Sequence, residues 1–265
     1  MSLGFIKMHA NGDDFVVIDA RGGSSQPSAA EVRRLGDRNR GIGFNQLAVI
    51  LDSDDAVAKL VFFNSDGSTL RACGSATRGV ADLLMQETGS NEVVLRTERG
   101  LFACQRRGPA EITVDMGEPL FAWDEVPLAS ACNTLHLPLP GDPTACSMGN
   151  PHCTFFVADL DAIDPSVLGP PIERHPLFPE RTNVHFVQVL NRTAIRLRIW
   201  ERGGGVPAGS GSCSCGAAVA AIRRSLTDKA VNVVCDGGSV HVAWSGVGGV
   251  RLTGKVTKVF EGEVR

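Results

Sequence analysis

The sequence predicts an α/β (α+β) protein of two similar domains from an internal duplication, each a curled mixed sheet or barrel around a central helix. The first observation is a repeat. Sliding the 265-residue sequence against itself by 137 positions, without gaps, aligns strands, turns and helices of the two halves. The second is one helix per half, so rich in glycine and alanine that it needs cover on most sides. The third is the set of short β-rich runs, bounded by turn dipeptides, that flank each helix.

A repeat of this length indicates a duplicated domain rather than a solenoid. We expect an N-terminal domain over residues 1–117 and a C-terminal domain over 118–253. The final stretch, 254–265, contains a strand pattern that is expected to return to the first domain. Residues 29–35 predict an amphipathic surface helix, which Gly36 is expected to end.

Polar residues recur at the ends of the aligned strands and at the starts of the aligned helices. The aligned pairs are Asp13 with Asn150, Gln46 with Asn183, Asn64 with Glu201, Cys73 with Ser210, Gly74 with Gly211, and Ser75 with Ser212. If the two halves face each other about a pseudo-two-fold axis, these residues converge on one cleft between the domains, which is a favoured place for a ligand. The sequence therefore predicts an active site in the interdomain cleft.

Composition excludes several classes of function. The formal net charge of -3 and the lack of like-charge blocks argue against nucleic-acid or membrane-surface partners. No leader pattern or eighteen-residue apolar run is found, so we expect a cytoplasmic protein. The eight cysteines are read as free thiols, and the lack of a Cys-x-x-Cys pair and the six scattered histidines predict no metal site.

Cys73 lies where a strand gives way to a helix. The unpaired amides and positive dipole end of a helix stabilise a thiolate there, and the same donors hold a carboxylate. Two such helix starts facing one substrate would bind its carboxylate and stabilise the enediolate-like charge formed when the neighbouring carbon loses a proton. Two side chains on opposite faces of that carbon suit inversion of a stereocentre without a cofactor.

Other interpretations of single residues stay open at this stage. Asn64 and Asn150 are equally typical of turns. Glu201 and Arg202 are compatible with an exposed ion pair of little consequence, although Arg202 is also suited to clamp a carboxylate.

Several motifs carry a resemblance that runs nearly end to end. They are Met8-His9-x-x-Gly12-x-Asp14-Phe15-Val16, Gly41-Ile42-Gly43-Phe44-x-Gln46, Phe63-Asn64-x-Asp66-Gly67, Cys73-Gly74, Gly149-Asn150-Pro151-His152, Arg181-x-Asn183 and Glu201-Arg202-Gly203-x-Gly205. With these motifs the chain resembles the diaminopimelate epimerase family. The resemblance implies a cofactor-independent epimerase that interconverts LL- and meso-diaminopimelate in lysine and peptidoglycan-precursor biosynthesis. The expected partners are a diamino diacid substrate and a second copy of the chain in a homodimer.

The resemblance also implies roles for the aligned residues. Asn64, Asn150, Asn183 and Arg202 would hold the far end of the substrate, and Glu201 its reacting amino group. Gly74, Ser75, Gly211 and Ser212 would hold the near carboxylate, with Asp13 and Gln46 also in the site. Cys73 and Ser210 would be the two acid/base residues.

The chain departs from the family pattern at important positions. Ser210 stands where the family has its second thiol, Asp13 where it has an asparagine, and Ser75 begins a changed stretch after the first thiol. A hydroxyl is far less acidic than a thiol, so Ser210 is a poor base.

Several explanations for Ser210 remain. In the first, the enzyme epimerises with Cys73 as base while Ser210 or a bound water returns the proton. In the second, Cys213 or Cys215 replaces the missing thiol. The second is disfavoured because the helix is expected to carry both side chains away from the site. Alternatively the chain is a one-base relative, either a racemase of another amino acid or a dehydratase. Two further explanations are a non-catalytic amino-acid-binding paralogue and an engineered Cys-to-Ser change.

Overall fold

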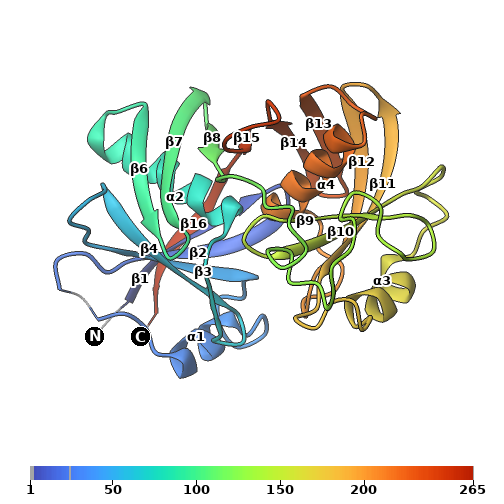
Figure 1. Cartoon of the computed structure of the whole chain (residues 1–265). Coiled ribbons are helices and arrows are strands. Elements are labelled where there is room, and N and C mark those ends of the chain that lie inside the picture. The colour runs from blue at the N-terminus through green and yellow to red at the C-terminus, as the bar shows by residue number, and fades with distance from the viewer. Residues whose placement is uncertain (1–2, 24, 265) are drawn as a thin grey trace. The chain divides into compact units, whose positions relative to one another are not determined.

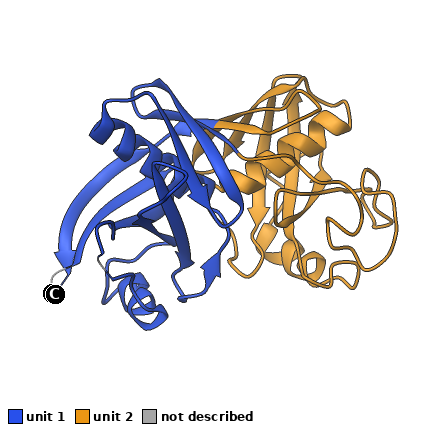
Figure 2. Ribbon diagram, turned by 60° about the vertical axis from the view of Figure 1, so that its left-hand side comes forward, with its two compact units in different colours: residues 1–115, 253–265 blue, residues 116–252 orange. Residues whose placement is uncertain are grey.

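The chain folds into two compact units (Figure 2). The structure is a computed structural model that describes residues 3–23 and 25–264. One unit, here unit 1, takes in the described residues up to 115 and those from 253 onward, and unit 2 takes in residues 116–252. Each unit is described separately.

Unit 1 is an open, curled sheet with one helix inside it and one on its surface (Figure 1). Its strand order is β16-β1-β2-β3-β4-β6-β7-β8, with the short β5 beside β4. The bounds are β1 (Leu3–Ala10), β2 (Asp13–Asp19), α1 (Ala29–Gly36), β3 (Gln46–Leu51), β4 (Ala58–Asn64), β5 (Thr69–Leu70), α2 (Gly74–Thr88), β6 (Glu92–Thr97), β7 (Gly100–Gly108), β8 (Glu111–Asp115) and β16 (Thr257–Val264).

Unit 2 repeats this plan with strand order β14-β13-β12-β11-β10-β9. The bounds are β9 (Thr144–Ser147), β10 (Pro151–Phe156), α3 (Pro165–Glu173), β11 (Asn183–Asn191), β12 (Ala194–Trp200), α4 (Gly211–Arg223), β13 (Ala230–Cys235) and β14 (Gly238–Ala243). The segment β15 (Arg251–Lys255) crosses the boundary between the units along the chain.

Strand register shows that the two units are copies of one design. Phe15 pairs with Gln46 in the parallel pair β2 and β3, and 137 positions later His152 pairs with Asn183 in the parallel pair β10 and β11. The antiparallel neighbours agree as well, since Leu47 pairs with Phe63 and Val184 with Trp200. The predicted duplication, with a curled mixed sheet in each half, is therefore confirmed.

A nearly fully buried helix lies inside each sheet, as expected from its small side chains. Helix α2 contacts β1, β2, β3, β6, β7 and β8, and α4 contacts β9 through β14. Small residues let the strands approach: a Cβ on Gly79 of α2 would lie 2.5 Å from the ring of Phe15, and one on Gly216 of α4 would lie 2.9 Å from the ring of His152. Most residues of α2 and α4 are buried against these strands.

The two other helices differ from the sequence-based expectations in detail. Helix α1 begins after a capping box made by Ser28 and Glu31, but it includes Gly36 and ends at Asp37 with φ −63°, so no left-handed glycine cap is used. Helix α3 was not expected, because Pro170 and Pro171 hide its pattern. Its start fits normal rules, since Asp164 caps it and Pro165 occupies the first turn.

None of the helices in the described ranges has both the length and the apolar character that a membrane crossing requires.

Candidate active site

Cys73 is the residue that caps helix α2. Its backbone is extended (φ −138°, ψ 110°), and its sulfur accepts a hydrogen bond from the amide of Ala76 at 3.4 Å. The sulfur also lies 3.9 Å from Oε1 of Gln46. Cys73 is half-buried, whereas the other described cysteines except Cys132 are buried. An amide donor at a helix start and access to solvent together favour a reactive thiolate.

Asn64 lies next to Gln46 because β3 and β4 pair the two residues directly. The Asn64 amide group donates to the hydroxyl of Ser68 at 3.0 Å, and the Asn64 carbonyl accepts from the amide of Gly67. Asn64 is therefore a turn residue, as its neighbours suggested, and its side chain is held in place at the strand end.

Two of the departures from the family pattern are in contact with each other. Asp13 lies almost fully buried at the start of β2, and its carboxyl is hydrogen-bonded to the side chain of Ser75 and to Nδ2 of Asn45. Burial raises the pKa of Asp13, while Ser75, Asn45 and the charge of Arg78 act in the opposite direction. The sequence pattern did not reveal this pairing, because the two residues are far apart along the chain.

In unit 2 the corresponding helix start is built differently. Ser210 is the N-cap of α4, but its side chain makes no hydrogen bond to the helix amides. Instead the thiol of Cys213 is hydrogen-bonded to the side chains of Ser210 and Ser212. Cys213 is fully buried in the first turn of α4, and the expectation that the helix carries it away from the site stays a prediction.

Cys213 is nevertheless unsuited to act as a base in this state. Burial raises the pKa of its thiol well above the usual range, and the negative charge of Glu201 raises it further. The hydroxyls of Ser210 and Ser212 oppose that shift less strongly. The thiol is therefore protonated near neutral pH.

The side chain of Asn183 is hydrogen-bonded to the backbone of Arg202. Oδ1 of Asn183 accepts from the Arg202 amide at 3.0 Å, and Nδ2 of Asn183 donates to the carbonyl of Pro151 at 3.1 Å. The Arg202 guanidinium donates to the carbonyl of Glu180 at 3.2 Å. Asn183 thus fixes the loop that carries Glu201 and Arg202.

Asn150 is oriented by a buried histidine. Its Oδ1 lies 2.9 Å from Nε2 of His152, and its Nδ2 donates to Oγ of Ser212 at 3.4 Å. His152 is in turn hydrogen-bonded to His185, through Nδ1 and Nε2 at 3.2 Å. His152 belongs to a sequence motif noted above, but its own pattern gave no reason to assign it a role, and His185 carried no signal at all.

The predicted residues thus gather into one group in each unit. In unit 1 the group holds Asp13, Gln46, Asn64, Cys73, Gly74 and Ser75, and in unit 2 it holds Asn150, Asn183, Glu201, Arg202, Ser210, Gly211 and Ser212. Both groups lie at strand ends and at the first turn of the enclosed helix. Each combines helix-start amides with polar side chains, which suits recognition of an amino acid.

Structural comparison places this architecture among known isomerase and phenazine-biosynthesis folds. The chain is similar to a phenazine biosynthesis protein of the PhzF family from Enterococcus faecalis, with a TM-score of 0.73, 13% identity and full coverage of both chains. It is also similar to a hydroxyproline epimerase from Agrobacterium vitis, with a TM-score of 0.69 and 16% identity over 99% of this chain and 92% of that one. At such identities the likeness establishes the fold alone.

Sequence comparison goes further. The family model for diaminopimelate epimerase matches residues 5–122 and 144–259. Diaminopimelate epimerase from Acidiphilium cryptum is 44% identical over 98% of this chain and 95% of its own length, and that from Gluconobacter oxydans is 46% identical over 99% of both. The chain belongs to the diaminopimelate epimerase family, and it is therefore an isomerase of the epimerase type.

Proposed function

We propose that the protein is a cofactor-independent epimerase that interconverts LL- and meso-diaminopimelate. The observation that carries the proposal is the half-buried Cys73 thiol, which caps α2 and accepts the Ala76 amide beside Gln46. Relatives named for this activity, 44% and 46% identical, support the choice of substrate.

Proton abstraction is assigned to Cys73. As a thiolate it takes the α-proton and becomes a neutral thiol, while the bonding electrons pass into the substrate carboxylate as an enediolate. The amides of Gly74 and Ser75, and of Gly211 and Ser212, would donate to that carboxylate, where the new negative charge develops. Helix-start amides are oriented before the reaction begins, so they stabilise this charge without reorganising.

The other face of the α-carbon is assigned to Ser210. In the forward direction its hydroxyl, or a water that it binds, gives a proton to the enediolate carbon and completes inversion. In the reverse direction the same group would have to abstract a proton, for which a hydroxyl is poorly suited. Because the equilibrium constant fixes the ratio of kcat/KM in the two directions, we expect inversion to be slower in both directions than with two thiols.

The remaining polar residues are assigned to substrate recognition. Asn64, Asn150, Asn183 and Arg202 would bind the distant amino and carboxylate groups, and Glu201 the reacting amino group, with Asp13 and Gln46 supporting the helix start. A guanidinium binds a carboxylate well because two parallel N–H donors match its two oxygens. A site with groups for both ends favours a diamino diacid over a simple amino acid.

Deuterium exchange tests the proposal directly. The protein is incubated with LL-diaminopimelate in deuterated water, and α-carbon exchange is followed together with the appearance of the meso form. Exchange accompanied by meso product is expected. A protein that catalyses no exchange would contradict the catalytic assignment and favour a non-catalytic amino-acid-binding paralogue.

A one-base reaction is the second candidate, and the contact of Ser210 with Cys213 favours it. A racemase of another amino acid or a dehydratase would need only Cys73 as base. Exchange without inversion, or loss of water from a hydroxylated substrate, would identify this case.

We also propose that the protein works in the cytoplasm as a homodimer. Free thiols in the described chain suit a reducing compartment. Strand β16 ends the sheet path of unit 1 and exposes Val259 and Phe260, which suits pairing with a second copy. Light scattering that gives the mass of a monomer at all concentrations would contradict the dimer.

A further inference from the structure

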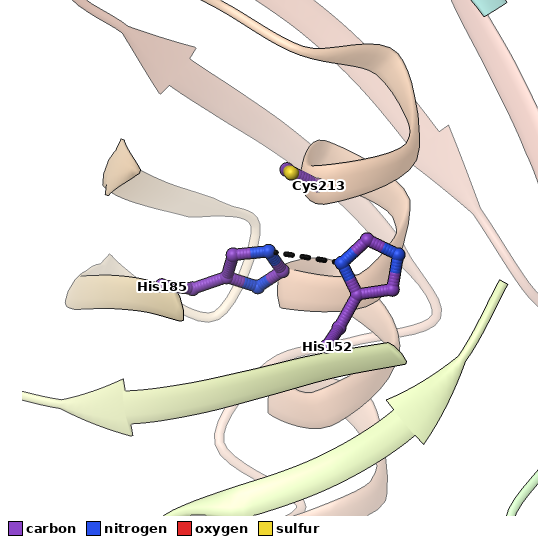
Figure 3. A group of neighbouring side chains, drawn as sticks. All are labelled: His152, His185 and Cys213. Atoms are coloured by element: carbon purple, nitrogen blue, oxygen red, sulfur yellow. Dashed lines mark hydrogen bonds between the residues drawn. The ribbon is translucent and has the colours of Figure 1, made fainter. Parts of the chain in front are cut away.

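Three side chains with metal-binding atoms meet inside unit 2. One imidazole nitrogen of His152, one of His185 and Sγ of Cys213 all lie within 4.8 Å of one another (Figure 3). All three residues are 0% exposed. His152 comes from β10, His185 from the neighbouring β11, and Cys213 from the first turn of α4. The sequence offered only scattered histidines, but the fold brings two of them together with a cysteine.

Unit 1 shows that the fold does not require polar groups at these positions. The residues 137 positions earlier are Phe15, Ala48 and Ala76, which are also 0% exposed. The same backbone therefore packs around an apolar triplet in one unit and around two imidazoles and a thiol in the other. Buried polar side chains destabilise a core unless they find partners, so the two imidazoles depend on the contacts described next.

The distances between the imidazoles already suit a shared ion. Nδ1 of His152 and Nε2 of His185 are 3.2 Å apart. A tetrahedral zinc ion with Zn–N bonds of about 2.0–2.1 Å separates two nitrogen ligands by about 3.3 Å, and a nitrogen and a sulfur ligand by about 3.6 Å. The sulfur lies within 4.8 Å of one nitrogen of each ring, and the Cys213 side chain would supply the third ligand once turned toward the rings.

The outer nitrogens are anchored in the way that is typical of metal-bound histidines. Nε2 of His152 faces Oδ1 of Asn150 at 2.9 Å, and Nδ1 of His185 faces Oγ1 of Thr154 at 3.1 Å. Such outer hydrogen bonds fix the ring and direct its other nitrogen at the ion.

Charge balance also fits a divalent ion. The carboxylate of Glu201 lies near the thiol of Cys213. One thiolate and this carboxylate together would neutralise the two positive charges of the ion, so the occupied site would carry no net charge. Two imidazoles and one thiolate form a donor set that suits zinc.

We propose that His152, His185 and Cys213 form a zinc-binding site in the core of unit 2. On binding, the Cys213 thiol loses its proton to solvent, and the His185 proton is carried on Nδ1, where it is donated to Thr154. His152 keeps its proton on Nε2, facing Asn150. One proton therefore leaves the protein for each ion bound. This inference does not depend on the proposed function, because metal content is measured without substrate.

The test uses variants that copy unit 1. In Cys213→Ala and His185→Ala each ligand is replaced by the residue at its repeat-equivalent position, which this backbone accommodates in unit 1. Cys215→Ala, which removes another buried thiol of α4, is the matched control. The full-length proteins are produced in zinc-supplemented medium, because a buried site fills most readily during folding, and their zinc content is measured by mass spectrometry.

Wild type and Cys215→Ala are expected to hold about one zinc per chain, and Cys213→Ala and His185→Ala only background zinc. Wild type produced with cobalt should show a sulfur-to-metal charge-transfer absorption, which gives a readout that needs no variant. A wild type that carries only background zinc, or a Cys213→Ala variant that carries as much as wild type, would overturn the proposal. Absence of this absorption from wild type produced with cobalt would overturn the proposal as well. The two histidines would then be only a hydrogen-bonded pair.

Discussion

The two helix starts occupy equivalent positions in the duplicated units, yet their N-cap side chains make different hydrogen bonds. In unit 1 the Cys73 sulfur turns toward the helix and accepts the Ala76 amide. In unit 2 the Ser210 hydroxyl makes no hydrogen bond to the helix amides and is instead hydrogen-bonded to the thiol of Cys213. One unit therefore presents a group whose negative charge the helix stabilises, and the other presents a neutral hydroxyl.

This difference shows how a symmetric fold can hold an asymmetric pair of reactive groups. The backbone register is shared between the units, as the matched pairings of β2 with β3 and of β10 with β11 show. The chemistry differs because one atom, sulfur or oxygen, decides whether the N-cap group is easily ionised. The following predictions test that asymmetry, beginning with the largest effect.

Removal of the Cys73 thiol should have the greatest consequence. Cys73→Ala is expected to lower α-proton exchange by a factor on the order of 10²–10⁴, which is the usual range for loss of a general acid or base. Exchange into diaminopimelate in deuterated water measures this. Cys132→Ala, which removes the other described thiol that is not buried, serves as the control and should exchange normally. Unchanged exchange in Cys73→Ala would show that the base lies elsewhere.

Restoring a thiol in unit 2 should make the two helix starts more alike. Ser210→Cys is expected to raise the ratio of inversion to exchange roughly tenfold, because a thiol exchanges protons more readily than a hydroxyl at neutral pH. The ratio is obtained by following meso product and deuterium together. Ser210→Ala is the companion variant and should keep exchange while inversion falls. An unchanged ratio in Ser210→Cys would show that residue 210 does not face the reacting carbon.

Stability should also distinguish the units at Gln46 and Asn183, which are equivalent in the repeat. Asn183→Ala removes two hydrogen bonds to backbone groups and is expected to lower the free energy of unfolding by about 1–3 kcal/mol. Gln46→Ala, at a partly exposed position, should change it by less than about 0.5 kcal/mol. Urea unfolding of both variants measures the difference. Equal losses would mean that Asn183 does not hold the Arg202 loop in solution.

The smallest effect concerns Asp13 and depends on pH. Its pKa is raised in the folded protein, mainly by burial, so the unfolded chain releases this proton at lower pH than the folded chain does. Stability from this group is therefore full below its ordinary pKa of 3.8 and is lost as pH rises through the raised value. Asp13→Asn lacks this loss, and its amide oxygen can still accept from Asn45.

Unfolding free energies of wild type and Asp13→Asn, measured across this pH range, give the result as a difference. The free energy of unfolding of Asp13→Asn should increase relative to that of wild type as pH rises, and the difference between the two should then stay constant. A difference that does not change with pH, or that changes in the other direction, would contradict the assigned burial of the carboxyl.

Much of the fold could be predicted because the duplication is visible without structural knowledge. Glycine spacing in α2 and α4, together with the apolar strands at a constant offset, predicted two similar units, and register pairs such as Phe15 with Gln46 confirm it. Helix α3 could not be predicted, because two prolines near its end obscure the helical pattern. The family was predicted correctly from short motifs around Cys73, Asn150 and Glu201.

The candidate site was predictable only as far as local patterns reach. Repeat positions and motifs selected the polar residues, whose roles stay predictions. The contacts between Asp13 and Ser75, and among His152, His185 and Cys213, depend on which strands are neighbours, and a single sequence does not specify that. The orientation of Cys213 toward Ser210 depends on side-chain geometry at a helix cap, which the expected helix alone did not resolve.

The pairing of β16 with β1 has a consequence for the order of events during synthesis. Unit 2 is one continuous segment, so the ribosome supplies all of it before the last strand of unit 1 exists. Until β16 emerges, β1 presents an unpaired edge, with Phe5 lacking the ring of Phe260 that later packs against it. Such an edge invites pairing with other nascent chains. The unit that carries Cys73 is begun before unit 2 and receives β16 after unit 2 has been made, so the folding of this part depends on a strand that follows unit 2 in the chain.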